Sequence, residues 1–358
     1  MSVGPVPPVG NPCCNRVLFG VVPALVKAMR RRDFIKGIAG SATSWPLAAR
    51  AQQPAQMRRI GVLMVVAEND PDAKRFVGAL ENQLEAEGWH KWRNLEITYR
   101  WGASNPERLA QYANELVLAA PDVLVTLGTA ALLPMKKATT TIPTVFTVVS
   151  DPVAQGFVAS LAHPGGNMTG FSNYEPQVGS RWLQLLKEVA PSATQIAVLF
   201  NPITSPYNAL WMRSIETAAP GFSVSTFQVS VQSDEDIRRA FDTMRTKPGT
   251  GLIVPSDSFT FERATLIASQ AMDGRIPAVY AFPRFAHEGG LISYGIDLVE
   301  QLGKAAIYVD RILKGERPGE LPVQGPTRYT MTINLKTAKA FGLTIASGLI
   351  ASADEVIE

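Results

Sequence analysis

RIGVLMVV, at residues 59–66, decides the fold of this 358-residue chain. Its apolar part, residues 60–66, directly follows two arginines, Arg58 and Arg59. Such a run, bounded by charge and too short for a buried helix, is typical of a strand covered on both faces. Strands buried on both faces belong to parallel sheets, so the run predicts an α/β protein.

Strand and helix patterns alternate after this run. Residues 72–87 carry Phe76, Leu80 and Leu84 at four-residue spacing, which predicts a helix that Gly88 ends. Further strands are predicted at 95–99, 122–127 and 144–149, with helices at 106–120 and between the last two strands. This alternation indicates a parallel sheet with helices on both faces.

The same alternation restarts after residue 170. Helices are predicted at 178–189, 207–219 and 234–244, and strands at 196–200, 223–229, 251–254 and 277–280. Ser233 is expected to cap the helix that begins at residue 234. Two similar halves predict two doubly wound, Rossmann-like lobes that face a cleft, because about 300 residues exceed the usual content of one core.

Three segments are candidate joints between the lobes. Gly165–Gly170 and Gly289–Gly295 are rich in glycine, and a strand-like third segment, 328–333, follows the Pro/Gly-rich stretch 315–326. Glycines there can absorb backbone rotation, which favours hinges, although ordinary surface turns would use the same residues. The tail 334–358 is predicted to form two short helices split at Gly342.

An export signal is predicted near the amino terminus. Arg31-Arg32 precede a short apolar segment, which ends at the small-residue site Ala49-Arg50-Ala51. This order is typical of a signal peptide of the twin-arginine route, with cleavage near Ala51-Gln52. The segment is too short to span a bilayer. Translation can begin at Met1 or at Met29, and the expected location is the periplasm.

Composition limits the possible functions after cleavage. Residues 1–51 hold seven basic residues and one acidic residue, so the remainder carries 27 basic and 30 acidic residues, a net charge of −3. This leaves no nucleic-acid footprint. Both cysteines, Cys13 and Cys14, precede the cleavage site. The mature chain would therefore have no disulfide, no thiolate nucleophile and no cysteine metal ligand.

The chain also resembles a known family, the periplasmic substrate-binding proteins of ABC transporters, in the group that includes the tryptophan-binding-like proteins. The resemblance covers about residues 58–358, and it depends on the order of several motifs. These motifs are RIGVL (59–63), TLGT (126–129), SDPV (150–153), GGNMTG (165–170), VPSD (254–257), ISYGID (292–297) and NLKTAK (334–339).

The resemblance implies two lobes joined by three crossover segments, the periplasmic binding protein type 1 fold. It implies a first lobe at 58–168 with a return segment at 291–325, and a second lobe at 169–290 with a carboxyl-terminal segment at 326–358. It also implies a small-molecule ligand clamped between the lobes, delivery to an ABC permease with a cytosolic ATPase, and no cofactor. A monomer is expected.

Open α/β sheets bind ligands beyond the carboxyl ends of their strands. The loops that follow the predicted strands hold the candidate ligand-binding residues Asn69, Gly128, Thr129, Ser150, Asp151, Asn201, Tyr207, Asp257, Tyr280 and Phe282.

These residue types fit an amino acid or a related carboxylate. Gly128-Thr129 and Ser150 lead toward helix amino termini, where free N–H groups favour a carboxylate. Asp151 and Asp257 are candidates to pair with an ammonium group, or else to start a turn and to cap a helix. The aromatic candidates, Tyr207, Tyr280 and Phe282, are either covers for the ligand body or core residues.

The sequence offers little for catalysis. His90, His163 and His287 are the only histidines, and no two have the spacing of a metal-binding H-x-x-x-H motif. No G-x-S-x-G elbow, Walker A loop or dinucleotide fingerprint is present, so no enzyme and no metal site is expected. Two alternatives stay open, a sensory module for a membrane receptor and a hydrolase or lyase with its site in the cleft.

Overall fold

The computed structural model describes residues 57–358. The predicted twin-arginine segment, its cleavage site and both cysteines lie outside the described residues.

The first lobe is built on a five-stranded sheet in which every neighbouring pair is parallel, in the order β2-β1-β3-β4-β5. Its strands are β1 (Arg58–Met64), β2 (Leu95–Trp101), β3 (Val123–Leu127), β4 (Thr144–Val149) and β5 (Met168–Ser172). The decisive run supplies β1, which lies between β2 and β3 and is buried from Ile60 onward. The predicted α/β class is confirmed, because helices cover both faces of this strand.

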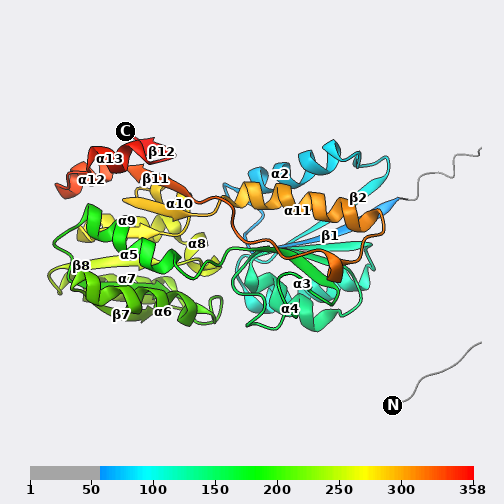
Figure 1. The fold of residues 1–358 in the computed structure, drawn as a ribbon, viewed down its shortest axis with the longest axis horizontal. Helices are drawn as coiled ribbons and strands as arrows, with labels where there is room; N and C mark the ends of the chain where they lie inside the picture. Colours follow the sequence, from blue (N-terminus) through cyan, green and yellow to red (C-terminus); the bar gives the residue numbers. More distant parts are fainter. Residues whose placement is uncertain (1–56) are drawn as a thin grey trace, which may run out of the picture. The chain divides into compact units, whose positions relative to one another are not determined.

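Two pairs of helices cover the two faces of this sheet (Figure 1). One face carries α2 (Ala73–Ala86) and α11 (Leu298–Leu313), and the other carries α3 (Pro106–Leu118) and α4 (Thr129–Ala138). Phe76, Leu80 and Leu84 are buried on α2, as their spacing predicts. Trp89 Nε1 donates a hydrogen bond of 2.8 Å to Asp310 Oδ1, which fixes α11 beside the end of α2 although the two helices are far apart in sequence.

The second lobe is built on a seven-stranded sheet in the order β12-β11-β10-β9-β8-β6-β7. Its strands are β6 (Gln195–Phe200), β7 (Ser225–Ser230), β8 (Thr250–Val254), β9 (Ala278–Tyr280), β10 (Ile292–Gly295), β11 (Thr330–Asn334) and β12 (Glu355–Ile357). Neighbours are parallel except β10 and β11, which are antiparallel.

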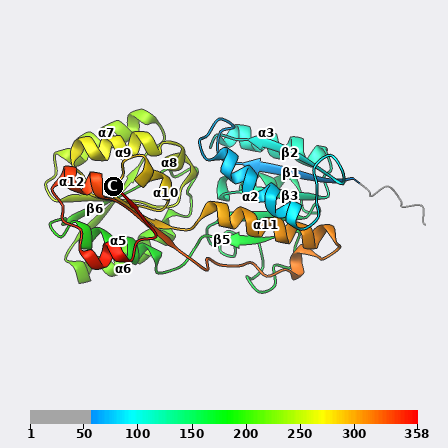
Figure 2. The ribbon, with the colours of Figure 1, turned by 90° about the horizontal axis from the view of Figure 1, so that it is seen from above.

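Helices cover this second sheet as well (Figure 2). One face carries α5 (Val178–Val189) and α6 (Asn208–Ala218), and the other carries α7 (Asp234–Arg245), α9 (Ala264–Gly274) and α10 (Pro283–His287). Shorter elements complete the described chain, namely α8 (Ser258–Glu262), α12 (Leu335–Phe341), α13 (Ser347–Ala351), η1 (Ala219–Phe222) and η2 (Pro318–Glu320). Ser233 Oγ accepts a hydrogen bond from the Asp236 N–H, which confirms the predicted cap of α7.

The chain crosses between the two sheets three times, at residues 173–177, 296–297 and 325–329. The first two crossings lie a few residues beyond the expected boundaries at 168–169 and 290–291. The reason is that β5 completes the first sheet and β10 belongs to the second.

Two glycines of the predicted joints lie inside these strands. A Cβ on Gly170, at φ +149°, would lie 1.9 Å from the carbonyl oxygen of Phe146, and one on Gly295 would lie 1.7 Å from that of Ala281. Both positions therefore need glycine for close backbone approach.

Candidate functional site

A small cavity lies between the lobes, where strands of both sheets end. Apolar side chains from the first lobe line it, namely Val65, Val66, Leu127 and Val148, together with Phe261 and Phe282 of the second lobe and Leu298 at the start of α11. Hydroxyl groups are supplied by Thr129, Thr204, Tyr207, Ser256 and Ser258. Its volume is about 30 Å³, little more than one water molecule needs, so a ligand can enter only when the lobes or these side chains move apart.

The first lobe presents the amino terminus of α4 to this cavity. Gly128 precedes the helix at φ 87°, a left-handed conformation that glycine adopts without strain. The N–H groups of Ala131 and Leu132 bond to the Gly128 carbonyl, so the first two amides, of Thr129 and Ala130, are left to face outward. This helix end carries partial positive charge and suits an anionic group of a ligand.

A distorted strand end brings Val148 to the same cavity. The register between β4 and β5 shifts between Phe146 and Val149, and Val148 has a φ of 58°. This conformation is an outlier for a β-branched residue, and bulges of this kind commonly re-aim side chains beside binding sites. This distortion could not be predicted from the sequence, because TVFTVV has the pattern of a regular strand.

The second lobe contributes a buried carboxylate directly behind the cavity wall. Asp257 is 1% exposed. Its Oδ2 accepts from the Asn201 N–H at 2.7 Å, and its Oδ1 accepts from Thr204 Oγ1 at 2.5 Å and from the Phe259 N–H at 3.0 Å. Burial raises the pKa of Asp257 to about 6, although these three hydrogen bonds act against the rise. Of its two predicted roles, the structure assigns Asp257 the helix cap of α8.

Four of the ten predicted site residues line the cavity, namely Gly128, Thr129, Tyr207 and Phe282. Burial raises the pKa of Tyr207, which keeps its hydroxyl neutral, and this hydroxyl donates to the Ser256 carbonyl at 3.3 Å. Three more lie one contact behind the wall. The Ser150 N–H donates to Thr129 Oγ1. The Asn201 N–H donates to Asp257, and Thr204 donates its N–H to the Asn201 side chain and its hydroxyl to Asp257.

The other three predicted residues lie elsewhere. Asn69 is exposed in the loop after β1. Asp151 has a φ of 41° and accepts a hydrogen bond from the Ala154 N–H, as a turn residue does. Tyr280 is fully buried and stacks on Phe285 with ring centroids 4.6 Å apart. The assignment of these ten residues to ligand binding is a prediction.

The ten predicted residues did not include Thr204, Ser258, Phe261 or Val148, although Ser258 directly follows the predicted Asp257. The loops that hold Thr204 and Ser258 could be found, since they follow β6 and β8. Which of their side chains faces the cavity depends on the hydrogen bonds around Asp257, and these are not visible in the sequence.

An ion pair holds the lobes together beside this cavity. Arg284 Nη1 lies 2.5 Å from Asp70 Oδ2, and the two side chains are only 11% and 4% exposed. The Arg284 guanidinium also lies over the Phe261 ring, 4.8 Å from its centroid, and Phe261 lies 6.5 Å from Phe76 of the first lobe. These contacts join α8 and α10 to the loop after β1, as a closed state requires.

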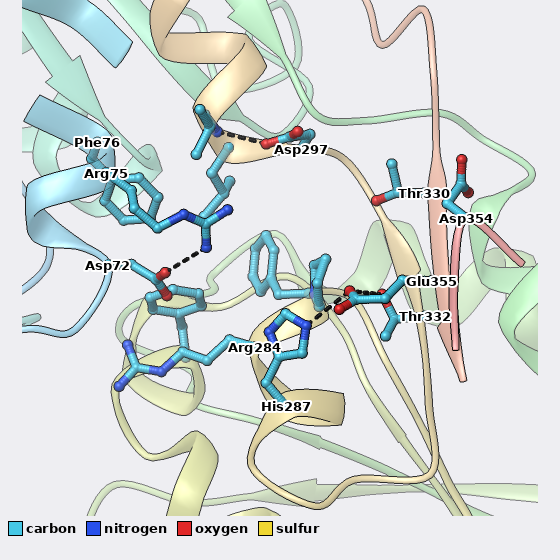
Figure 3. A pocket seen from close by; sticks show the side chains of 15 residues that line it. Asp72, Arg75, Phe76, Arg284, His287, Asp297, Thr330, Thr332, Asp354 and Glu355 are labelled. Carbon is cyan, nitrogen blue, oxygen red and sulfur yellow. Dashed lines mark hydrogen bonds and ion pairs between the residues drawn. The ribbon is translucent and has the colours of Figure 1, made fainter. Parts of the chain in front are cut away.

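A second, larger interlobe cavity of about 260 Å³ lies beyond Phe261, Phe282 and Leu298, which line both (Figure 3). Most of the ionisable side chains around it are paired with one another or with residues just outside it. Asp72 pairs with Arg75 at 2.9 Å, and His287 with Glu355 at 2.8 Å.

The raised pKa of Glu262 makes the free energy of unfolding depend on pH. Burial raises its pKa to about 7 and the nearby Asp70 adds to the rise, while Arg263 and Arg284 oppose it. A carboxyl group with a raised pKa binds its proton more tightly in the folded state, as Asp257 also does. Their stabilising contribution is complete below about pH 4 and is lost as the pH rises through 6 to 7.

We therefore expect the free energy of unfolding to fall between pH 5 and pH 8, with Glu262 contributing about 1–2 kcal/mol after allowance for its partial exposure. Urea unfolding across this range would measure the slope. Glu262→Gln should flatten it. Asp236→Asn is the matched control, because the pKa of that exposed carboxyl is lowered and it does not titrate in this window. An identical slope for Glu262→Gln and the unchanged protein would contradict the assignment.

Together, the two α/β lobes, three crossings and an interlobe cavity at the strand ends define a two-lobed binding protein of the periplasmic binding protein type 1 fold. Residues 59–357 match the family model described as ABC transporter substrate binding protein. The chain belongs to this family, and its function is solute binding.

The chain is similar over most of its length to several relatives and solved structures. A tyrosine-binding protein of Clostridioides difficile (strain R20291) is 27% identical over 292 residues, which are 80% of this chain and 82% of that protein. A conserved domain protein from Vibrio cholerae O1 biovar El Tor has a TM-score of 0.78 at 28% identity, over 84% of this chain and 100% of that one. The ABC domain from Streptococcus pneumonia in complex with L-Trp also has a TM-score of 0.78, at 23% identity and the same coverages.

Residues 57–358 contain neither a membrane-spanning helix nor a metal-binding cluster. Within this range no helix combines the length and apolar character that a membrane span needs. In the same residues no group of three or more His, Cys, Asp or Glu side chains is arranged to hold a metal ion.

Proposed function

We propose that this chain captures an amino acid with an aromatic or branched side chain in its interlobe cavity and delivers it to an ABC permease with a cytosolic ATPase. The observation that carries the proposal is the polarity of the cavity. The amino terminus of α4 lies on one side, and the buried carboxylate of Asp257 lies behind the other. A zwitterion matches this pair of poles, and the apolar side chains between them match its body.

The relatives support the same ligand class, since one is named for tyrosine binding and another is a complex with L-Trp. We further propose that the protein acts as a periplasmic monomer without catalytic activity, exported through the predicted twin-arginine segment. Closure on the ligand is a shift between open and closed states, set by the difference in ligand affinity between them.

The test is a thermal-shift screen of residues 52–358 with L-Trp, L-Tyr, branched amino acids, organic acids, sugars and nucleosides. A ligand at 100 times its dissociation constant should add about 2.7 kcal/mol to the free energy of unfolding, a clear rise in melting temperature. Mass spectrometry of the ligand afterwards checks for turnover. Stabilisation by sugars alone, or conversion of the bound ligand, would contradict the proposal.

A further inference from the structure

The hydrogen bond between the Thr204 hydroxyl and Asp257 determines how Thr204 can contact a ligand. It lies in the loop between β6 and α6, lines the cavity and is 3% exposed. Its Oγ1 lies 2.5 Å from Asp257 Oδ1. An ionised carboxylate only accepts, so the Thr204 hydroxyl hydrogen points to Asp257. Toward any ligand, Thr204 can therefore only accept.

The hydroxyl of Ser258 has no hydrogen-bond partner among the described residues. Ser258 also lines the cavity, and its Oγ is buried. A buried hydroxyl without a partner is costly, and a ligand that supplies one removes that cost.

The carboxylate of Asp257 makes the surroundings of Thr204 and Ser258 negative. Among residues 57–358 it takes part in no ion pair, and the guanidinium of nearby Arg263 is engaged with Asp234 at 2.6 Å and with the Phe259 ring. The positive charge of Arg263 lowers the pKa of Asp257, but it is shared with Asp234, so a further cation near this buried carboxylate is favoured. Thr204 stands between this carboxylate and the cavity, and its oxygen is made a better acceptor by donating to the carboxylate.

We propose that Thr204 and Ser258, backed by Asp257, form the subsite for the ammonium group of the ligand. The inference rests on the proposed function and deepens it. It makes Thr204 a specificity-determining residue that distinguishes an α-amino acid from the same acid without its amino group. Asp257 is then a positioning residue that acts through Thr204.

The two poles also belong to different lobes, since α4 lies in the first and Thr204 in the second. A zwitterion that touches both joins the lobes through its own backbone atoms. An acid that lacks the amino group engages only the first lobe firmly, so it should bind more weakly and favour closure less.

The test combines a substitution with a ligand change. The probes are L-tryptophan and L-tyrosine, each beside its deaminated counterpart, 3-(indol-3-yl)propionate or 3-(4-hydroxyphenyl)propionate. Calorimetry on the full chain gives each affinity. Thr204→Val keeps the shape of the side chain but removes the acceptor, and should weaken amino acid binding about 10- to 100-fold while changing that of the deaminated acid less than threefold. Thr204→Ser should restore binding to within a few-fold.

Thr260→Val is the matched control. Thr260 is an equally buried threonine in α8 whose hydroxyl donates to the Asp257 carbonyl, and it does not line the cavity. It should lower the melting temperature without separating the two kinds of probe. Melting curves of each ligand-free variant show whether Thr204→Val is folded, and Thr204→Ser keeps the test decisive if it is not.

The outcomes separate the two proposals. If amino acids bind and Thr204→Val weakens both kinds of probe equally, or neither, the ammonium subsite is wrong and the proposed function stands. If only the deaminated acids bind the unchanged protein, the subsite and the amino acid assignment fail while solute binding stands. If neither kind binds and no branched amino acid stabilises the protein in the thermal-shift screen, both proposals are rejected.

Discussion

Asp257→Ala is expected to lower the free energy of unfolding by about 2–4 kcal/mol and to weaken ligand binding. The carboxylate accepts three hydrogen bonds from groups that are themselves buried, the N–H groups of Asn201 and Phe259 and the hydroxyl of Thr204. Alanine leaves all three donors without an acceptor. Alanine also removes the unfavourable burial of the charge, which is the cause of the raised pKa of Asp257, and this partly offsets the loss of stability.

Urea unfolding, followed by tryptophan fluorescence, would measure this change. Asp236→Ala is the matched control, since Asp236 also accepts a backbone N–H, from Gln232, but its side chain is partly exposed and water can replace the lost acceptor, so the effect should be smaller. Equal effects of the two substitutions would mean that the Asp257 network does not hold the loop after β6 and the start of α8 together.

Gly170→Ala should have the largest effect on folding. A methyl group at this position would lie 1.9 Å from the Phe146 carbonyl oxygen in the neighbouring strand, and the φ of +149° is one that alanine rarely adopts. We expect a loss of at least about 4 kcal/mol, which is most of the stability of a protein at the lower end of the usual range of about 5–15 kcal/mol.

Gly166→Ala provides the comparison within the same motif, GGNMTG. Nothing lies within 4 Å of a Cβ at Gly166, and its φ is not in the left-handed region, so this variant should fold with little change. Circular dichroism and the yield of folded protein would distinguish them. A Gly170→Ala protein as stable as Gly166→Ala would show that β4 and β5 can separate to admit a side chain.

Most of the fold could be predicted from periodicity. The helix expected at 178–189 is α5 with the same bounds, and the strand expected at 144–149 is β4. In both segments the burial pattern follows directly from the order of apolar residues. Local chemistry identified the Ser233 cap for the same reason, since a cap depends only on residues close in sequence.

The segments that the sequence did not predict depend on distant partners. β5 and β10 contain glycines at points of close backbone approach, and glycine-rich stretches also suggest joints. α11 carries Leu302, Ala305, Ala306 and Val309 on its buried face at helical spacing, so its signal was present within the return segment. That it packs beside α2 could not be known from spacing alone.

The sequence predicted which loops form the site, but not which of their side chains face the cavity. The rule for strand ends located the loops after β3, β6, β8 and β9, and residues of all four line the cavity. After β1 the cavity is lined by Val65 and Val66, which were predicted inside the strand, and not by Asn69. The same rule could not choose between Asp257 and Thr204. That choice depends on which group is bonded behind the wall, and sequence position does not record it.

The three crossings make each lobe a discontinuous piece of chain. The first sheet is complete at Ser172, but α11, which covers it beside α2, begins only at Leu298. During synthesis the apolar face of the first lobe therefore stays uncovered while most of the second lobe is made. No single cut yields a whole lobe, because a first lobe alone would require residues 57–172 to be spliced to 297–324. The first lobe is completed at about residue 324, after most of the second lobe has been made, and the second lobe is completed only with β12.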